Sequence, residues 1–341
     1  WENNLTLNNS TFEEKRQRLN YKAAAHTFLP SLNAFSGYEI REGRSLDPET
    51  NGYTENKNFA NSYGVNARLL IFNGLRQHHL LAYEKYRLQA SRSDYERQKN
   101  DIAFLIMDAY INNLSNEGLM LIQEEQVELS RKEVHRITRS IDVGLSSGSD
   151  LYEAQARLAA DEYMLVQYRN LSAKSKNDIK RLMNLPMDTV LDLHPIAEYE
   201  EGIVEISTDS IAGISKSKLP EVKSARAMLA ASHRLTNAAR SSLLPSLQAF
   251  SSWGTSYFGA FDSEINSFNN QFKNNRQLQY GISLNIPLLD AFQRRNYLQQ
   301  TKINREQAEN DLLVTLQNLE YDIGQALLDW KGAIAEYQAA Q

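Results

Sequence analysis

Alternation of apolar and polar residues marks two segments of the chain as β-strands with one apolar and one polar face. In the segment 277–286, every second residue is apolar: Leu278, Tyr280, Ile282, Leu284 and Ile286. The residues between them are polar or small: Gln277, Gln279, Gly281, Ser283 and Asn285. The segment 62–71 repeats the pattern, with Ser62, Gly64, Asn66 and Arg68 on its polar side. We therefore expect each strand to meet water through one face only.

A weaker alternation predicts partner strands at 30–41 and 245–258, so that each pair of strands forms a hairpin. The partner strands carry four aromatic residues of the types that favour membrane interfaces: Tyr38, Trp253, Tyr257 and Phe258. All these strands have roughly the 9–11 residues that a tilted transmembrane β-strand needs. Long polar loops are expected between the strands, at 42–61 and 259–276.

Helical periodicity follows each hairpin. Between Gly74 and Ile141 the chain has no proline and only one further glycine, Gly118, which predicts a single helix of 68 residues. Such a helix would be on the order of 100 Å long. A narrow stripe of residues suits coiled-coil packing: Ile102, Leu105, Ile106, Ala109, Tyr110 and Asn113. We expect the helix to pack against others along its length.

A sharp turn between two helices is predicted at Val143, Gly144, Leu145 and Ser146. Gly144 supplies the helix stop, and Ser149 or Asp150 is expected to cap the next helix. Asp150 and Glu153 have the spacing of a capping box. The returning helix is expected to run from residue 151 to about 183.

The same order of features occurs twice, about 215 residues apart. Residues 28–36 read FLPSLNAFS, and residues 243–251 read LLPSLQAFS. Each copy follows an alanine-rich helical stretch that stops at the proline, because proline cannot continue a helix. The strands then leave through Phe72-Asn73-Gly74 in one copy and Leu289-Asp290-Ala291 in the other.

The chain is therefore expected to contain two structural repeats joined by a linker at 184–219. The first repeat covers 1–183, with a helix at 1–29, a β-hairpin at 30–72 and a long helical hairpin at 73–183. The second covers 220–341, with a helix at 220–244, a β-hairpin at 245–289 and a long helix at 290–341. Because the chain stops at Gln341 before a second helical turn, the second repeat is expected to be truncated.

Composition removes several classes of function. The net charge of -5, with both signs interspersed, argues against a nucleic-acid partner, which would need a concentrated basic face. No run of 18 apolar residues is present, so any membrane crossing must use β-strands. The absence of Cys removes thiolate chemistry and disulfides.

Four membrane strands cannot stand alone, because their unpaired edge groups would cost several kcal/mol each in lipid. The expected fold is membrane α+β, closed as a trimer into a 12-stranded β-barrel, with the long helices continuing as an α-helical barrel. The polar strand residues would then face the pore: Asn66, Arg68, Gln277, Gln279, Ser283 and Asn285.

With its paired Leu-Pro-Ser-Leu strand starts and its Val-Gly-Leu-Ser turn, the chain resembles the TolC-like outer-membrane efflux proteins. The resemblance implies a homotrimer in the outer membrane of a Gram-negative bacterium, extending into the periplasm and in contact with outer-membrane lipid. It also implies a periplasmic adaptor protein and an inner-membrane transporter as partners, and passive transport of drugs or other substrates without a cofactor or a reaction. The turn at Val143, Gly144, Leu145 and Ser146 would contact the adaptor.

Three pairs of adjacent residues suggest other chemistry. His78-His79 could bind a metal, but neighbouring helical positions diverge by about 100° and no third ligand follows at a suitable spacing. Glu124-Glu125 and Asp161-Glu162 could be acid–base pairs, but adjacent residues on a long helix more simply form its solvated face. The main alternative function is a periplasmic adaptor or a soluble coiled-coil scaffold, which would have one helical hairpin bracketed by the halves of a compact β-domain. The duplicated membrane-length hairpins favour the channel.

Overall fold

The computed structural model of the chain describes residues 4–46, 53–194, 208–261 and 264–340. Its elements, in chain order, are α1 (Leu5–His26), β1 (Ser31–Leu46), β2 (Tyr53–Phe72), α2 (Arg76–Asp142), α3 (Gly148–Met183), α4 (Thr208–Lys218), α5 (Pro220–Ser241), β3 (Ser246–Ala260), α6 (Phe268–Asn274), β4 (Gln277–Asn285) and α7 (Gln293–Ala340). None of the described helices combines the length and the apolar character needed to cross a membrane.

The chain forms two compact units, and each takes segments from both sequence repeats. The helical unit consists of Trp1–Glu14, Ser91–Glu221 and Asp322–Gln341. The sheet unit consists of Lys15–Ala90 and Val222–Tyr321. Because α1, α2 and α7 each contribute residues to both, the compact units are not the two repeats.

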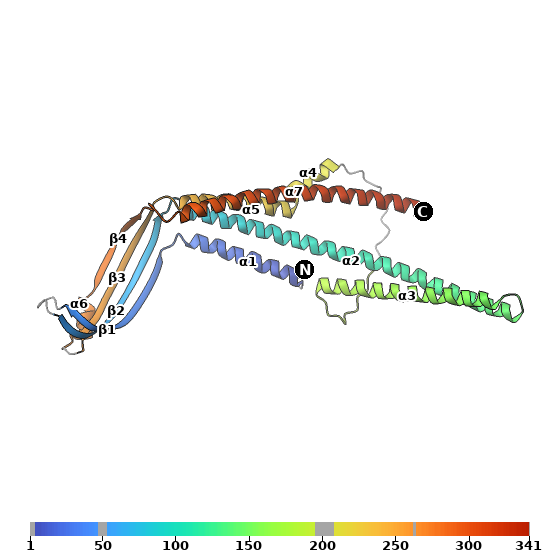
Figure 1. The fold of residues 1–341 in the computed structure, drawn as a ribbon, viewed down its shortest axis with the longest axis horizontal. Helices are drawn as coiled ribbons and strands as arrows, with labels where there is room; N and C mark the ends of the chain where they lie inside the picture. Colours follow the sequence, from blue (N-terminus) through green and yellow to red (C-terminus); the bar gives the residue numbers. More distant parts are fainter. Residues whose placement is uncertain (1–3, 47–52, 195–207, 262–263, 341) are drawn as a thin grey trace. The chain divides into compact units, whose positions relative to one another are not determined.

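The four described strands form one antiparallel sheet in the order β1-β2-β3-β4 (Figure 1). Residues that are directly opposite in such a sheet point to the same side. One row across the sheet is Asn33, Asn66, Ser252 and Gln279. A neighbouring row is Ala34, Val65, Trp253 and Leu278. The sheet therefore has a polar face, the side of Asn66 and Gln279, and an apolar face, the side of Val65 and Leu278.

The first hairpin is longer than its sequence pattern predicts. The prediction of a loop at 42–61 is wrong for the described residues, because β1 continues to Leu46 and β2 begins at Tyr53. Polar residues form strand here because the backbone ladder does not depend on side-chain polarity, and opposite charges stabilise the pair across it. Lys57, for example, lies 2.8 Å from the carboxylate of its direct partner Glu42.

The second hairpin departs from the prediction in a different way. Part of the expected loop at 259–276 is the helix α6, and residues 262–263 lie outside the described part of the chain. Strand β4 ends its pairing at Gln277 opposite Gly254, so β3 continues beyond it to Ala260. Gln271 of α6 accepts a hydrogen bond from the Phe258 N–H (3.0 Å) and donates one to the Phe258 carbonyl (2.9 Å). A side-chain amide thus takes the place of a neighbouring strand and satisfies this part of the β3 edge.

Helices α2 and α3 form an antiparallel pair within the helical unit. Three ion pairs join them, Arg131–Glu162 at 2.9 Å, Arg169–Glu124 at 2.8 Å and Lys176–Glu117 at 2.6 Å. In the buried seam, fully enclosed Asn113 accepts hydrogen bonds from Ser172 (3.3 Å) and Ser175 (3.0 Å). Glu124 and Glu162 therefore bridge the two helices instead of forming only a solvated face.

Helix α5 approaches α7 closely because its buried positions carry small residues. Ala227, Ala231, Ala238 and Ala239 of α5 are all buried. The Thr236 hydroxyl donates a hydrogen bond to the Thr301 carbonyl of α7 (3.0 Å), which requires the two backbones to lie near each other. The predicted linker at 184–219 also contains a helix, α4, while residues 195–207 lie outside the described part of the chain.

Candidate functional site

The polar face of the sheet collects all six strand residues that the sequence assigned to a pore. Asn66 and Arg68 lie on β2, and four more lie on β4: Gln277, Gln279, Ser283 and Asn285. The register adds polar residues that the weaker alternation of β1 and β3 did not single out, among them Asn33, Gln248 and Ser252. The Ser252 hydroxyl donates a hydrogen bond to Asn66 Oδ1 (2.7 Å), which ties β3 to β2 on this face.

A phenylalanine ring covers a glycine on the polar face of each hairpin. A Cβ added to Gly64 would lie 2.6 Å from ring atoms of Phe35, its direct partner across the strands. A Cβ added to Gly281 would lie 3.0 Å from the ring of its partner Phe250. Sequence reasoning missed these pairs, although the same Phe and Gly recur at matching positions of the two copies. The ring fills the space that a glycine leaves open in a sheet.

The apolar face exposes large side chains over all four strands. On β4, Leu278, Tyr280, Ile282 and Leu284 are each more than 60% exposed, and Leu32 of β1 is 71% exposed. Soluble monomers seldom leave a contiguous apolar surface of this kind open. The described part of the chain leaves these side chains of the face uncovered.

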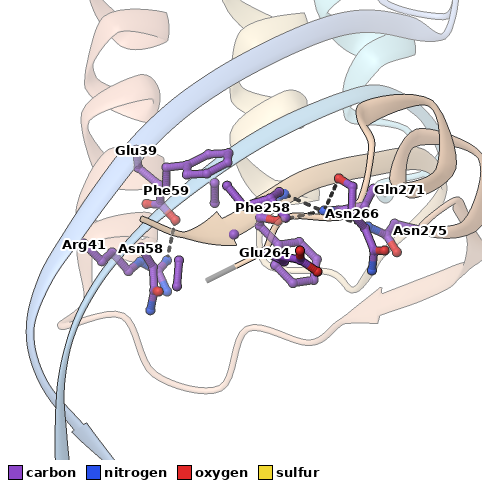
Figure 2. A pocket seen from close by; sticks show the side chains of 13 residues that line it. Glu39, Arg41, Asn58, Phe59, Phe258, Glu264, Asn266, Gln271 and Asn275 are labelled. Carbon is purple, nitrogen blue, oxygen red and sulfur yellow. Dashed lines mark hydrogen bonds and ion pairs between the residues drawn. The ribbon is translucent and has the colours of Figure 1, made fainter. Parts of the chain in front are cut away.

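A pocket of about 640 Å³ lies where the sheet continues beyond β4 (Figure 2). An ion pair between Arg41 and Glu39 (2.6 Å) lines one part of it, and Gln271, already bonded to the β3 backbone, lines another. Among the described residues that line it, none is a Ser, Thr, Cys, His or Lys.

The turn between α2 and α3 is fixed by hydrogen bonds at both of its ends. Gly144 has φ +77°, and two bonds of a Schellman motif close α2: the Gly144 N–H to the Ile141 carbonyl (2.9 Å) and the Leu145 N–H to the Ser140 carbonyl (2.8 Å). Val143 and Leu145 remain 68% and 81% exposed. The turn thus presents two apolar side chains on a hydrogen-bonded backbone.

The cap of α3 differs from the one expected. Ser147, not Ser149 or Asp150, is the N-cap, and its hydroxyl accepts from the Asp150 N–H (3.3 Å). The Asp150 carboxylate accepts from the Ser147 N–H (2.8 Å), so the capping box is Ser147–Asp150 instead of Asp150–Glu153. The helix begins earlier than expected because Ser147 and Asp150 then satisfy each other's backbone N–H groups.

A basic hollow of about 510 Å³ lies beside the turn on α2. Its lining includes Lys132, His135, Arg136 and Arg139. Arg136 donates two hydrogen bonds to Glu133 (2.8 and 2.5 Å), and these hold the pKa of that carboxyl below its usual value. Lys132 and Arg139 are the other two strongly basic side chains of this hollow.

His78 and His79 have different surroundings. The ring of Phe28 stands edge-on to His78 at 4.9 Å, while burial and then the charges of Arg234 and His78 lower the pKa of His79. Among the described residues, no three His, Cys, Asp or Glu side chains are grouped so that they could hold a metal ion.

Comparison with known proteins gives the family. The sequence profile of the outer membrane efflux protein family matches residues 1–185 and 215–341. Protein CyaE of Bordetella pertussis is 20% identical over 324 residues, covering 93% of this chain and 65% of that protein. The alkaline protease secretion protein AprF of Pseudomonas aeruginosa is 23% identical over 238 residues, which cover 68% of this chain and 48% of AprF. The probable efflux pump outer membrane protein TtgC of Pseudomonas putida is 23% identical over 263 residues, which cover 74% of this chain and 52% of TtgC. The chain thus spans roughly half to two thirds of the length of these relatives.

Solved structures share the fold at lower identity. A membrane protein from Pseudomonas aeruginosa superposes with a TM-score of 0.82 at 16% identity, over 99% of this chain and 76% of that one. The CmeC outer membrane channel of Campylobacter jejuni gives a TM-score of 0.80 at 16% identity, over 99% of this chain and 71% of CmeC. Because the family profile matches nearly the whole chain, the chain belongs to the outer membrane efflux protein family, whose place is the outer membrane of Gram-negative bacteria, extending into the periplasm.

Proposed function

We propose that the chain is the protomer of a homotrimeric outer-membrane channel that conducts drugs or other substrates passively to the cell exterior. A periplasmic adaptor and an inner-membrane transporter would deliver the cargo. The observation that carries the proposal is a four-stranded sheet with one polar face, one exposed apolar face and two open edges.

The strand order supports closure by copies of the same chain. In the described sheet, β1 and β4 each pair on one side only. In lipid, each unpaired backbone group would cost several kcal/mol, so the edges must pair with other strands. Because successive strands alternate in direction, β4 of one copy would lie antiparallel to β1 of the next. Three copies then give a closed barrel of twelve strands, with an even number as in other such barrels.

The two faces of the sheet support its orientation. In a closed barrel, the apolar face, which includes Trp253 and Leu278, would contact lipid. The polar face, with Asn66, Arg68 and Gln279, would line a water-filled lumen. An outward apolar band and a polar interior are the pattern of transmembrane β-barrels.

The α2–α3 turn supports a docking role. Val143 and Leu145 are exposed apolar side chains on a backbone that the Schellman motif and the capping box already order. A partner would therefore lose little conformational entropy by binding them. We assign contact with the adaptor to the turn residues Val143, Gly144, Leu145 and Ser146.

The names of related proteins indicate which kinds of cargo such proteins carry. AprF is described as an alkaline protease secretion protein, and TtgC as a probable efflux pump outer membrane protein. Protease secretion and efflux are thus both named among proteins similar to this chain. Efflux channels are not enzymes, so the transporter would supply the energy.

Reconstitution into planar lipid bilayers tests the proposal. The intact protein should give discrete conductance steps that follow the applied voltage without nucleotide, because an open polar lumen needs no energy source. If the protein is found in the soluble fraction of lysed bacteria and gives no conductance in bilayers, the adaptor or scaffold function is favoured instead.

A further inference from the structure

The polar face of the sheet carries very few charges. By the strand register, its charged residues are Glu39 and Arg41 of β1 and Arg68 of β2. Glu39 and Arg41 form an ion pair of 2.6 Å, so their charges largely cancel. In the described part of the chain, the guanidinium of Arg68 has no ion-pair partner, and Arg68 is exposed. The face therefore has one uncompensated charge, and it is positive.

Arg68 borders a hollow of about 320 Å³ on this face. Other side chains that line the hollow are Asn66, Gln248, Phe250, Ser252 and Ser283. No carboxylate is among the described lining residues, so no negatively charged side chain there repels an anion. Gln248 and Ser283, which are directly opposite each other, add an amide and a hydroxyl donor. Phe250, the direct partner of Arg68, adds an aromatic surface.

We propose that this hollow is an anion site and that Arg68 makes the channel favour anionic over cationic cargo. The ligands it fits are small organic anions with a carboxylate, sulfonate or phosphate group, because a guanidinium binds their paired oxygens through two parallel N–H donors. The inference rests on the proposed channel, in which the polar face is turned inward. Three copies would place three Arg68 side chains around one lumen.

Salt dependence follows from this arrangement. Screening acts over about 30 Å at 0.01 M salt but only about 3 Å at 1 M. The three guanidinium groups should therefore act jointly on passing ions in dilute salt and hardly at all in concentrated salt.

The test is the reversal potential of the intact protein in planar bilayers under a KCl gradient. At low salt, Arg68→Gln should lower the ratio of chloride to potassium permeability at least twofold, and the difference should vanish near 1 M. Arg68→Lys should keep most of the preference, which separates loss of charge from damage to the fold. Sodium tripolyphosphate should block the wild-type current, and Arg68→Gln should require several-fold more of it.

Arg44→Gln is the matched control, because it removes the same charge from the apolar face, where the guanidinium of Arg44 lies 4.7 Å from the centre of the Tyr53 ring. This variant should leave the permeability ratio unchanged. If the wild type conducts and Arg68→Gln has the same ratio and the same block, the anion site is refuted while the channel stands. A change in Arg44→Gln instead of Arg68→Gln would refute the orientation of the faces. A protein without any conductance would refute both the channel and the site.

Discussion

Replacement of Gly64 by alanine should destabilise the sheet through one identifiable clash. The added Cβ would stand 2.6 Å from two ring atoms of Phe35 and 3.0 Å from the backbone oxygen of Trp253. Carbon atoms pack best at about 3.5–4.0 Å, so the ring would have to retreat by roughly 1 Å. Phe35 is 47% exposed and can swing outward, but the Trp253 backbone is held between β2 and β4 and cannot.

The size of the effect follows from these two contacts. Overpacking costs about 1–3 kcal/mol, and the gain of alanine over glycine in a strand offsets about 0.5–1 kcal/mol of it. We therefore expect a net loss of up to about 2.5 kcal/mol per protomer. In Gly281→Ala the Cβ meets only the ring of Phe250, at 3.0 Å, so that loss should be smaller. Gly118→Ala is the control, since no atom lies within 4 Å and the helix interior should gain up to about 1 kcal/mol.

Thermal unfolding of the detergent-purified protein, followed by circular dichroism, gives the order of the variants. The midpoint should be lowest for Gly64→Ala, intermediate for Gly281→Ala and highest for Gly118→Ala. The double variant Phe35→Ala/Gly64→Ala should lose less than the sum of its single changes, because the ring is then absent. A Gly64→Ala protein as stable as the wild type, or strictly additive losses in the double variant, would refute this reasoning.

Three further predictions concern the two candidate surfaces. A cysteine at Gln279 should react with a water-soluble thiol reagent in the membrane-inserted protein and a cysteine at Tyr280 should not; the reverse result would mean that the faces are inverted. Gly144→Trp should abolish export in cells while trimer assembly stays intact, because the bulky ring alters the docking turn; normal drug resistance of cells with this variant would refute the docking role. Ser147→Ala should cost about 1 kcal/mol through loss of the cap, as a urea titration can measure, whereas Ser149→Ala should be nearly neutral. Equal losses in the two variants would contradict the observed cap.

The elements best predicted from the sequence are those in which the polarity of each side chain matches its environment. Strand β4 alternates strictly because each of its residues meets either the polar or the apolar side of the sheet, and its predicted range of 277–286 differs from the observed one by a single residue. Helix α2 was found equally well, since its residues follow a helical period and no proline interrupts them.

Other features depend on contacts that periodicity does not record. The outer parts of β1 and β2 are polar on both faces, as in the opposed pair Glu42–Lys57, so only the backbone ladder reveals them as strand. The N-cap of α3 was placed two or three residues too late because several Ser and Asp side chains could cap a helix there, and the geometry of the turn selects Ser147. The Phe35–Gly64 pair lies across two strands and needs the register to be seen.

The central claim, a trimeric outer-membrane channel, is tested most directly by the location and mass of the intact protein. Bacterial membranes should be fractionated, the outer membrane extracted with detergent and the protein sized by light scattering. The account predicts a trimer in the outer-membrane fraction. A monomer that is soluble without detergent would contradict it, because the apolar face and the open edges of the sheet would then never meet lipid or another copy.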